Sequence, residues 1–251
     1  MKRDSVRQIV VALATVATIV INVLANALPI NGQTTAEISD RIQVYFTPAG
    51  YVFAIWGLIY LGLIVFTIYQ ALPAQRANPA LRRVGWPYVV SCLANSAWIF
   101  LWHYDQIAWS LVAMGVLLVA LIAIYLLLGI GLGKGPSKER WPVRAPFSVY
   151  LGWITVATVA NVAAYLWTIG WGGWGLRPEV WTAIMIAVAA ILGVLVLATR
   201  RDPLYALVLV WALAGIVQKH PEILVISLTA GAAAVGLFLG AVVALWRKLT
   251  V

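Results

Sequence analysis

The sequence predicts an all-α membrane protein, a polytopic bundle of about eight transmembrane helices. Of its 251 residues, 63% are hydrophobic and only 10% are charged, whereas soluble domains hold about 45–50% apolar and about 25% charged residues. Apolar runs recur along the chain, each close to the roughly 20 residues that cross a hydrocarbon core as a helix. They lack the alternation of polar and apolar residues that a lipid-spanning barrel requires.

Polar residues, glycines and prolines divide the apolar runs into eight expected spans. These spans cover Gln8–Leu28, Ala49–Leu72, Trp86–Trp102, Ile107–Leu132, Ala145–Thr168, Pro178–Thr199, Pro203–Gln218 and Ile223–Trp246. The seventh is the shortest, and at 1.5 Å per residue it covers only about 24 Å. It therefore fits a thin span, a half-membrane helix or a segment buried by its neighbours.

The distribution of basic residues supports this division and gives an orientation. If the N-terminus is cytoplasmic, the outer side holds only Arg41, Arg177 and Lys219, and every other Lys and Arg falls on the inner side. This bias follows the positive-inside rule. It predicts that both termini are cytoplasmic, and it explains the net charge of +9 without a nucleic-acid partner.

The first span has two readings. Lys2 and Arg3 precede an apolar stretch that ends in Ala25-Asn26-Ala27, which is similar to a signal-peptide cleavage site. The run from Ile9 to Leu28 is longer than a usual signal core, so we expect an uncleaved anchor. The compact chain, its charge bias and the lack of a targeting presequence favour a prokaryotic cytoplasmic membrane.

Conventional catalysis and metal binding are not expected. Cys92 is the only cysteine, so an intrachain disulfide and a CxxC motif are excluded. The sequence contains no paired carboxylates, nucleophile elbow, P-loop or HExxH motif. A metal site would require the loops of His103 and His220 to meet. No ionisable side chain lies deep in a span, which argues against an ion channel or proton-coupled transporter.

The second span carries an aromatic face. Pro48 and Gly50 mark a turn into this helix, and Phe53, Trp56 and Tyr60 follow at i, i+3 and i+7. Side chains at this spacing lie on one side of a helix. The pattern therefore predicts a surface of stacked or clustered rings.

Two other spans carry amides beside tryptophans. The third contains Asn95 and Trp98, and the fifth contains Trp153 and Asn161 on one stripe. Trp56, Asn95, Trp98 and Asn161 each fall roughly 7–12 Å from the outer end of their span, so they could line a pocket in the outer half of the membrane. The alternative is that they form packing surface and interhelical hydrogen bonds.

These residues resemble the TspO/translocator protein family, the tryptophan-rich sensory proteins. Phe46–Tyr60 resembles the family's loop and second-helix signature, in which a proline-containing loop leads into Val-Phe, then Trp, then Leu-x-Tyr. Asn95 with Trp98 resembles its third-helix Asn-x-x-Trp. The residues similar to its fifth-helix pattern are Pro146, Trp153 and Asn161.

The resemblance implies a five-helix core over residues 1–168, whose cavity binds tetrapyrroles such as protoporphyrin IX and, in some members, sterols. Family members are often dimers, which implies a homodimer. The loop between the first two helices would roof the cavity with Phe46, Pro48 and Phe53. The residues to which ligand-binding or supporting roles carry over are Trp56, Tyr60, Asn95, Trp98, Trp153 and Asn161.

The chain departs from the family pattern in two places. Residues 169–251 add about three transmembrane helices that these motifs do not cover, although residues 1–251 are expected to form a single membrane domain. Pro48-Ala49-Gly50 stands where a double proline is more usual. Ligand identity is therefore less firmly implied than the fold.

The expected function is that of a membrane receptor or carrier for a flat hydrophobic molecule, such as a porphyrin or a sterol-like compound. No cofactor is required, although a porphyrin could be bound, and the expected partners are the lipid bilayer and this small molecule. The alternatives are a secondary transporter of a small hydrophobic solute, a light- or oxygen-dependent porphyrin-modifying enzyme, and a non-catalytic assembly partner.

Overall fold

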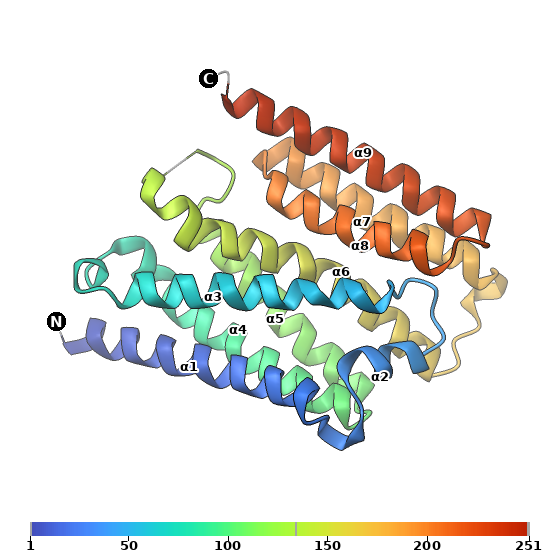
Figure 1. The fold of residues 1–251 in the computed structure, drawn as a ribbon, viewed down its shortest axis with the longest axis horizontal. Coiled ribbons are helices and arrows are strands. Elements are labelled where there is room, and N and C mark those ends of the chain that lie inside the picture. The colour runs from blue at the N-terminus through green and yellow to red at the C-terminus, as the bar shows by residue number, and fades with distance from the viewer. Residues whose placement is uncertain (1, 134, 250–251) are drawn as a thin grey trace. The chain divides into compact units, whose positions relative to one another are not determined.

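The computed structural model describes residues 2–133 and 135–249, and within these ranges the chain forms helices and no strands (Figure 1). The α-helices are α1 (Lys2–Ala27), α2 (Thr35–Arg41), α3 (Ile55–Ala71), α4 (Pro79–His103), α5 (Ile107–Leu127), α6 (Ala145–Thr168), α7 (Pro178–Arg200), α8 (Pro203–Lys219) and α9 (Leu224–Leu249). A 3-10 helix, Gly50–Ala54, leads directly into α3, and a π-helical turn, Arg140–Arg144, leads into α6.

Seven helices of the described chain are long and apolar enough to cross a membrane, and α8 is a shorter apolar helix. The predicted all-α bundle of membrane helices is therefore confirmed. The expected fifth span coincides with α6, Ala145–Thr168. The eighth apolar run of the sequence corresponds to α9, which begins at Leu224.

The predicted start of the third span at Trp86 is wrong, because α4 begins at Pro79. The Asn78 side chain accepts hydrogen bonds from the amides of Ala80 and Leu81 and so caps the helix, and proline is favoured in the first turn. Arg82 and Arg83, near the start of α4, interrupt the apolar run without interrupting the helix. The short polar helix α2 was also not expected, because it carries no long apolar run.

The chain divides into two compact units. The first comprises Met1–Ile38 and Trp56–Leu151, and the second comprises Ser39–Ile55 and Gly152–Val251. The boundaries fall within α2, at the start of α3 and within α6. None coincides with residue 168, where the sequence interpretation placed the end of a five-helix core.

Hydroxyl groups and aromatic rings hold the first unit together. The Thr15 hydroxyl of α1 shares hydrogen bonds with the hydroxyls of Thr67 on α3, at 2.7 Å, and Tyr88 on α4, at 2.8 Å. The Tyr88 ring contacts Phe66 and Phe147, with ring centroids 4.9 and 5.7 Å away. Side-chain hydrogen bonds of this kind connect neighbouring helices where water is absent.

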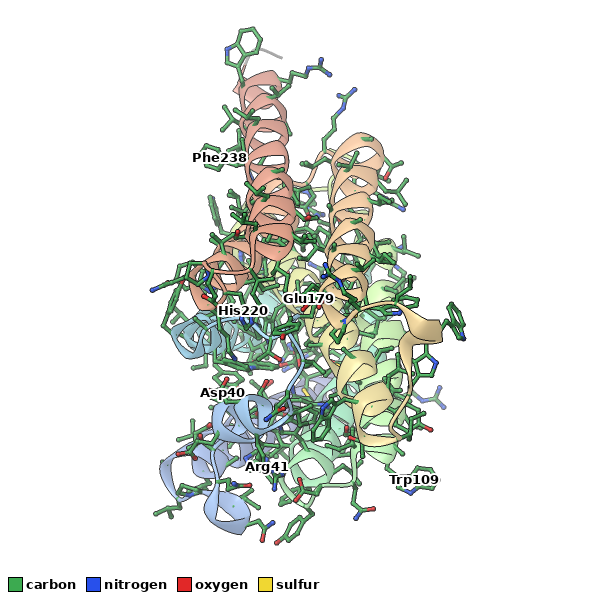
Figure 2. All side chains as sticks on the ribbon, turned by 90° about the vertical axis from the view of Figure 1, so that its right-hand side faces the viewer. Asp40, Arg41, Trp109, Glu179, His220 and Phe238 are labelled. Atoms are coloured by element: carbon green, nitrogen blue, oxygen red, sulfur yellow. The ribbon has the colours of Figure 1, made fainter. Side chains whose placement is uncertain are left out.

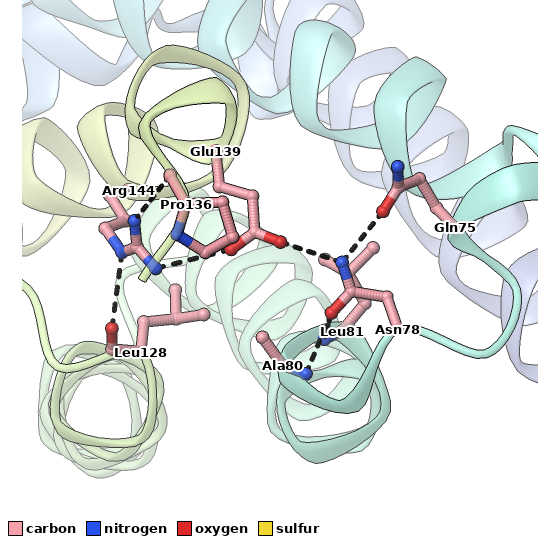
Figure 3. A network of polar contacts seen from close by, with 8 residues as sticks. All are labelled: Gln75, Asn78, Ala80, Leu81, Leu128, Pro136, Glu139 and Arg144. Carbon is pink, nitrogen blue, oxygen red and sulfur yellow. Dashed lines mark hydrogen bonds and ion pairs between the residues drawn. The ribbon is translucent and has the colours of Figure 1, made fainter. Parts of the chain in front are cut away.

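A polar network joins two loops of the first unit (Figure 3). The Glu139 side chain is only 3% exposed and accepts hydrogen bonds from Asn78 Nδ2 at 2.8 Å and from an Arg144 terminal nitrogen at 3.3 Å. Asn78 also donates to Gln75 Oε1 at 2.8 Å. The network therefore connects the α3–α4 loop to the turn before α6.

Close helix contacts at glycines hold the second unit together. A Cβ atom added at Gly152 of α6 would lie 3.0 Å from the Tyr205 carbonyl oxygen of α8. The Tyr205 hydroxyl donates to Thr155 Oγ1 at 2.9 Å and so joins the same two helices. An added Cβ at Gly193 of α7 would lie 3.0 Å from Leu209 Cδ2 of α8. The fold of α8 against α6 and α7 thus requires small residues at these crossings.

We expect Glu139→Ala to lower the free energy of unfolding by about 3 kcal/mol, because it leaves the Arg144 guanidinium without its buried partner. Thermal or denaturant unfolding of the purified protein in detergent measures this loss. Glu179→Ala is the matched control, since its partner Arg177 is 73% exposed and such a pair contributes about 1 kcal/mol or less. Equal losses in the two variants would contradict a stabilising role for the network.

Candidate ligand-binding site

Four aromatic rings of the first unit lie in nearly parallel planes. Trp56 of α3 stacks on Tyr60 at 5.6 Å and on Trp98 of α4 at 6.5 Å, with interplanar angles of 20° and 30°. Trp98 stacks in turn on Trp102 at 5.6 Å and 22°. We call Tyr60, Trp56, Trp98 and Trp102 the ring series. The spacing of four residues on each helix places its two rings one above the other.

A chain of amides and a phenol supports the ring series. Asn22 Nδ2 of α1 donates to Asn95 Oδ1 at 2.7 Å, and Asn95 Nδ2 donates to the Tyr150 hydroxyl at 2.9 Å. The Tyr150 ring meets Trp56 edge-on, with centroids 6.0 Å apart. Asn95 is fully buried and has the partners that burial of an amide requires. These hydrogen bonds hold the Tyr150 ring beside Trp56.

The remaining site residues predicted from the sequence lie in the second unit. The Phe53 ring meets Trp153 edge-on at 5.8 Å. Trp153 and Asn161 of α6 are buried, as are Phe46 and Pro48. The structure thus groups Trp56, Tyr60, Asn95 and Trp98 in one unit, and Phe53 with Trp153 in the other. That the two groups bind one ligand stays a prediction.

Sequence reasoning missed two contributors. Asn22 was not singled out, although an amide in an otherwise apolar span is itself a signal of a polar partner. The second contributor is α8, which contacts the segment before α3: the Ala49 amide donates to the Gly215 carbonyl at 3.1 Å, and Trp211 Nε1 donates to the Val52 carbonyl at 3.0 Å. The spacing of residues within α8 could not predict which residues Trp211 contacts.

Charged and titratable groups gather where α8 ends in the second unit. Lys219 Nζ donates to Asp40 Oδ1 at 2.5 Å, and the next residue, His220, meets the Tyr45 ring edge-on at 5.3 Å. Burial lowers the pKa of His220 below its ordinary value, the charge of Lys219 lowers it further, and Glu222 opposes the shift. Burial and the charge of Lys219 therefore favour neutral His220.

The other histidine, His103, ends α4 in the first unit. It is 1% exposed, and its ring Nδ1 lies 2.8 Å from the Ile99 carbonyl oxygen. The Asn31 side chain donates to the His103 carbonyl at 2.9 Å. In the described part of the chain, no group of three or more His, Cys, Asp or Glu side chains could hold a metal ion.

The family model for TSPO-like proteins matches residues 8–243 of the chain. The chain belongs to this family. The predicted membership of the TspO family is therefore confirmed, and the match continues through α7 and α8 and into α9, which the sequence motifs did not reach. As a TSPO-like protein whose described residues include seven apolar helices of spanning length, it is an integral membrane protein of the lipid bilayer.

Comparisons with curated proteins and with solved structures gave no match. The assignment of this protein to the TSPO-like family therefore rests on the family match.

We expect Asn95→Ala to lower the free energy of unfolding by about 1–3 kcal/mol, because it leaves the Asn22 amide and the Tyr150 hydroxyl without their buried partner. Tyr150→Phe should cost about 1 kcal/mol or less, since single hydrogen bonds between membrane helices contribute little. Unfolding in detergent measures both, with Tyr104→Phe as control because Tyr104 is 56% exposed. If Asn95→Ala matched the control, the amide chain would not stabilise the unit.

We also expect His220 to make stability depend on pH. Its pKa is lowered from 6.5 in the folded protein, so its contribution is complete above the unfolded pKa and is lost as the pH falls through the folded pKa. The measurement is the thermal unfolding temperature from about pH 7 to about pH 5. As the pH is lowered, this temperature should fall more steeply in the wild type than in His220→Gln. Parallel pH profiles would contradict this role.

Proposed function

We propose that this TSPO-like protein is a membrane receptor or carrier for a planar hydrophobic ligand, such as a porphyrin or a sterol-like molecule. The observation that carries the proposal is the ring series, in which stacked rings lie 5.6–6.5 Å apart with interplanar angles of 20–30°. Aromatic planes of this kind favour offset stacking with a further flat ring system. A conjugated macrocycle is the ligand class that gains most from such a surface.

Burial distinguishes the two ends of the ring series. Trp98 and Trp102 are 6% and 5% exposed, whereas Trp56 and Tyr60 are half-buried. A ligand therefore reaches Trp56 and Tyr60 first. Apolar surface with few polar groups is typical of small-molecule sites, and the partly exposed end of the series has this character.

Asn95 has a supporting role in this proposal. Its side-chain oxygen accepts from Asn22 and its nitrogen donates to Tyr150, so it orients the ring beside Trp56 and does not contact the ligand. Trp153 and Asn161, together with Phe46, Pro48 and Phe53, keep the ligand-facing or roof roles that the family resemblance implies. The ligand is a cargo or a signal, no cofactor is needed, and no reaction is catalysed.

The proposed setting is the cytoplasmic membrane of a prokaryote, with both termini in the cytoplasm and the protein assembled as a homodimer. The orientation is supported by the distribution of basic residues, since only Arg41, Arg177 and Lys219 lie on the outer side in this arrangement. The homodimer rests on the family resemblance alone.

The test is a titration of the purified protein in lipid nanodiscs with protoporphyrin IX. We expect saturable quenching of tryptophan fluorescence, and we expect Trp56→Phe to raise Kd about three- to tenfold, because phenylalanine offers a smaller stacking surface. The chain holds 13 tryptophans, so the quenching does not report on Trp56 by itself. The absorbance of the porphyrin is therefore followed as a second signal of binding.

Trp109→Phe is the matched control. Trp109 is 64% exposed on α5 and lies at the surface (Figure 2), and the two variants contain the same number of tryptophans. Equal Kd values for the two variants would contradict the assignment of the ring series. Quenching no greater than that of an unrelated membrane protein would contradict porphyrin binding itself.

A further inference from the structure

Helix α8 makes two hydrogen bonds to residues 49–52 of the Ser39–Ile55 segment in its own unit. The Trp211 indole donates to the Val52 carbonyl at 3.0 Å, and the Ala49 amide donates to the Gly215 carbonyl at 3.1 Å. The Tyr51 ring also meets Trp211 edge-on, with centroids 5.2 Å apart. This segment carries the residues to which the roof role was assigned, Phe46, Pro48 and Phe53.

The fit at Gly215 depends on the absence of a side chain. A Cβ atom added there would overlap Val52 Cγ2 and would lie 3.1 Å from Pro48 Cβ. Val52 is fully buried, so it has little room to move aside. Glycine therefore permits a close approach of the segment to the α8 backbone that alanine would prevent.

The contacts continue along one face of α8. Trp211, Gly215 and Lys219 are spaced by four residues, which places them on one side of the helix. Lys219 pairs with Asp40, near the start of the same segment. Away from the segment, α8 is joined to α6 by the Tyr205–Thr155 hydrogen bond, and it packs closely on α6 at Gly152 and on α7 at Gly193. Helix α8 is thus fixed independently of the segment that it holds.

We propose that Trp211 and Gly215 are positioning residues, which hold the Ser39–Ile55 segment in the conformation that ligand binding requires. The part of this inference that concerns the ligand rests on the proposed function. The part that concerns the segment rests on the hydrogen bonds and the close contact at Gly215, and it can be measured without a ligand. Residues of the chain's C-terminal third thereby act on the segment that enters α3.

The experiment is hydrogen exchange of the backbone amides of residues 49–54, measured in nanodiscs on the full chain. Trp211→Phe keeps a smaller ring beside Tyr51 and removes the indole donor, so these amides should exchange about two- to tenfold faster. Gly215→Ala forces the segment away from α8 and should accelerate exchange about tenfold or more. The matched controls are Trp109→Phe and Gly236→Ala, since a Cβ added at Gly236 meets no described atom within 4 Å.

The same four variants are titrated with protoporphyrin IX. Faster exchange together with a raised Kd in Trp211→Phe and Gly215→Ala, and in neither control, supports the proposal. Wild-type exchange in both variants overturns it. Faster exchange with an unchanged Kd overturns the positioning role for the ligand. If the wild type itself does not bind the porphyrin, the proposed function fails, and the exchange rates still decide whether α8 holds the segment.

Discussion

Polar groups that lie among apolar helices must find their hydrogen-bond partners within the protein, because the bilayer core offers no water. This constraint organises the first unit. The Thr15 hydroxyl meets partners on α3 and α4, and the Asn22 amide meets Asn95. Each bond is individually weak, at about 1 kcal/mol. Their effect is chiefly to select one register of helix against helix, because a slip would leave several polar atoms unpaired at once.

The register chosen by the polar contacts decides where the aromatic rings lie. With Asn95 held between α1 and α6, Trp98 of the following turn is brought beside Trp56 of α3. The same amide orients Tyr150 against the edge of Trp56. The side chains of Asn22, Asn95 and Tyr150 thus bond to one another, and Trp56 and Tyr60 form the half-buried end of the ring series. Under the proposed function, this arrangement favours a flat apolar ligand over a strongly polar one.

Much of this could be predicted from the sequence, and the failures have a physical pattern. The apolar runs and the polar breaks between them identified the apolar helices and the limits of α6, and helical spacing placed Trp56 and Tyr60 on one face. The sequence interpretation misplaced the start of α4, because the helix extends beyond its apolar run. It also left Trp211 without a role, since the hydrogen bond from Trp211 to Val52 joins residues 159 positions apart. Spacing along one helix reveals which residues share a face but not what that face meets.

The constraint on polar groups also explains why α8 matters to the segment before α3. The chain there turns through Pro48 and Ala49 into a 3-10 helix at Gly50–Ala54, so its amides and carbonyls lack the complete internal bonding of an α-helix. Irregular backbone at membrane depth is tolerated where protein surrounds it. Helix α8 supplies an indole donor for Val52 and a carbonyl acceptor for Ala49, and it does so at the point where a glycine allows close approach. A partner of this kind has to place a small residue among apolar neighbours where the segment approaches it, and Gly215 of α8 meets that requirement.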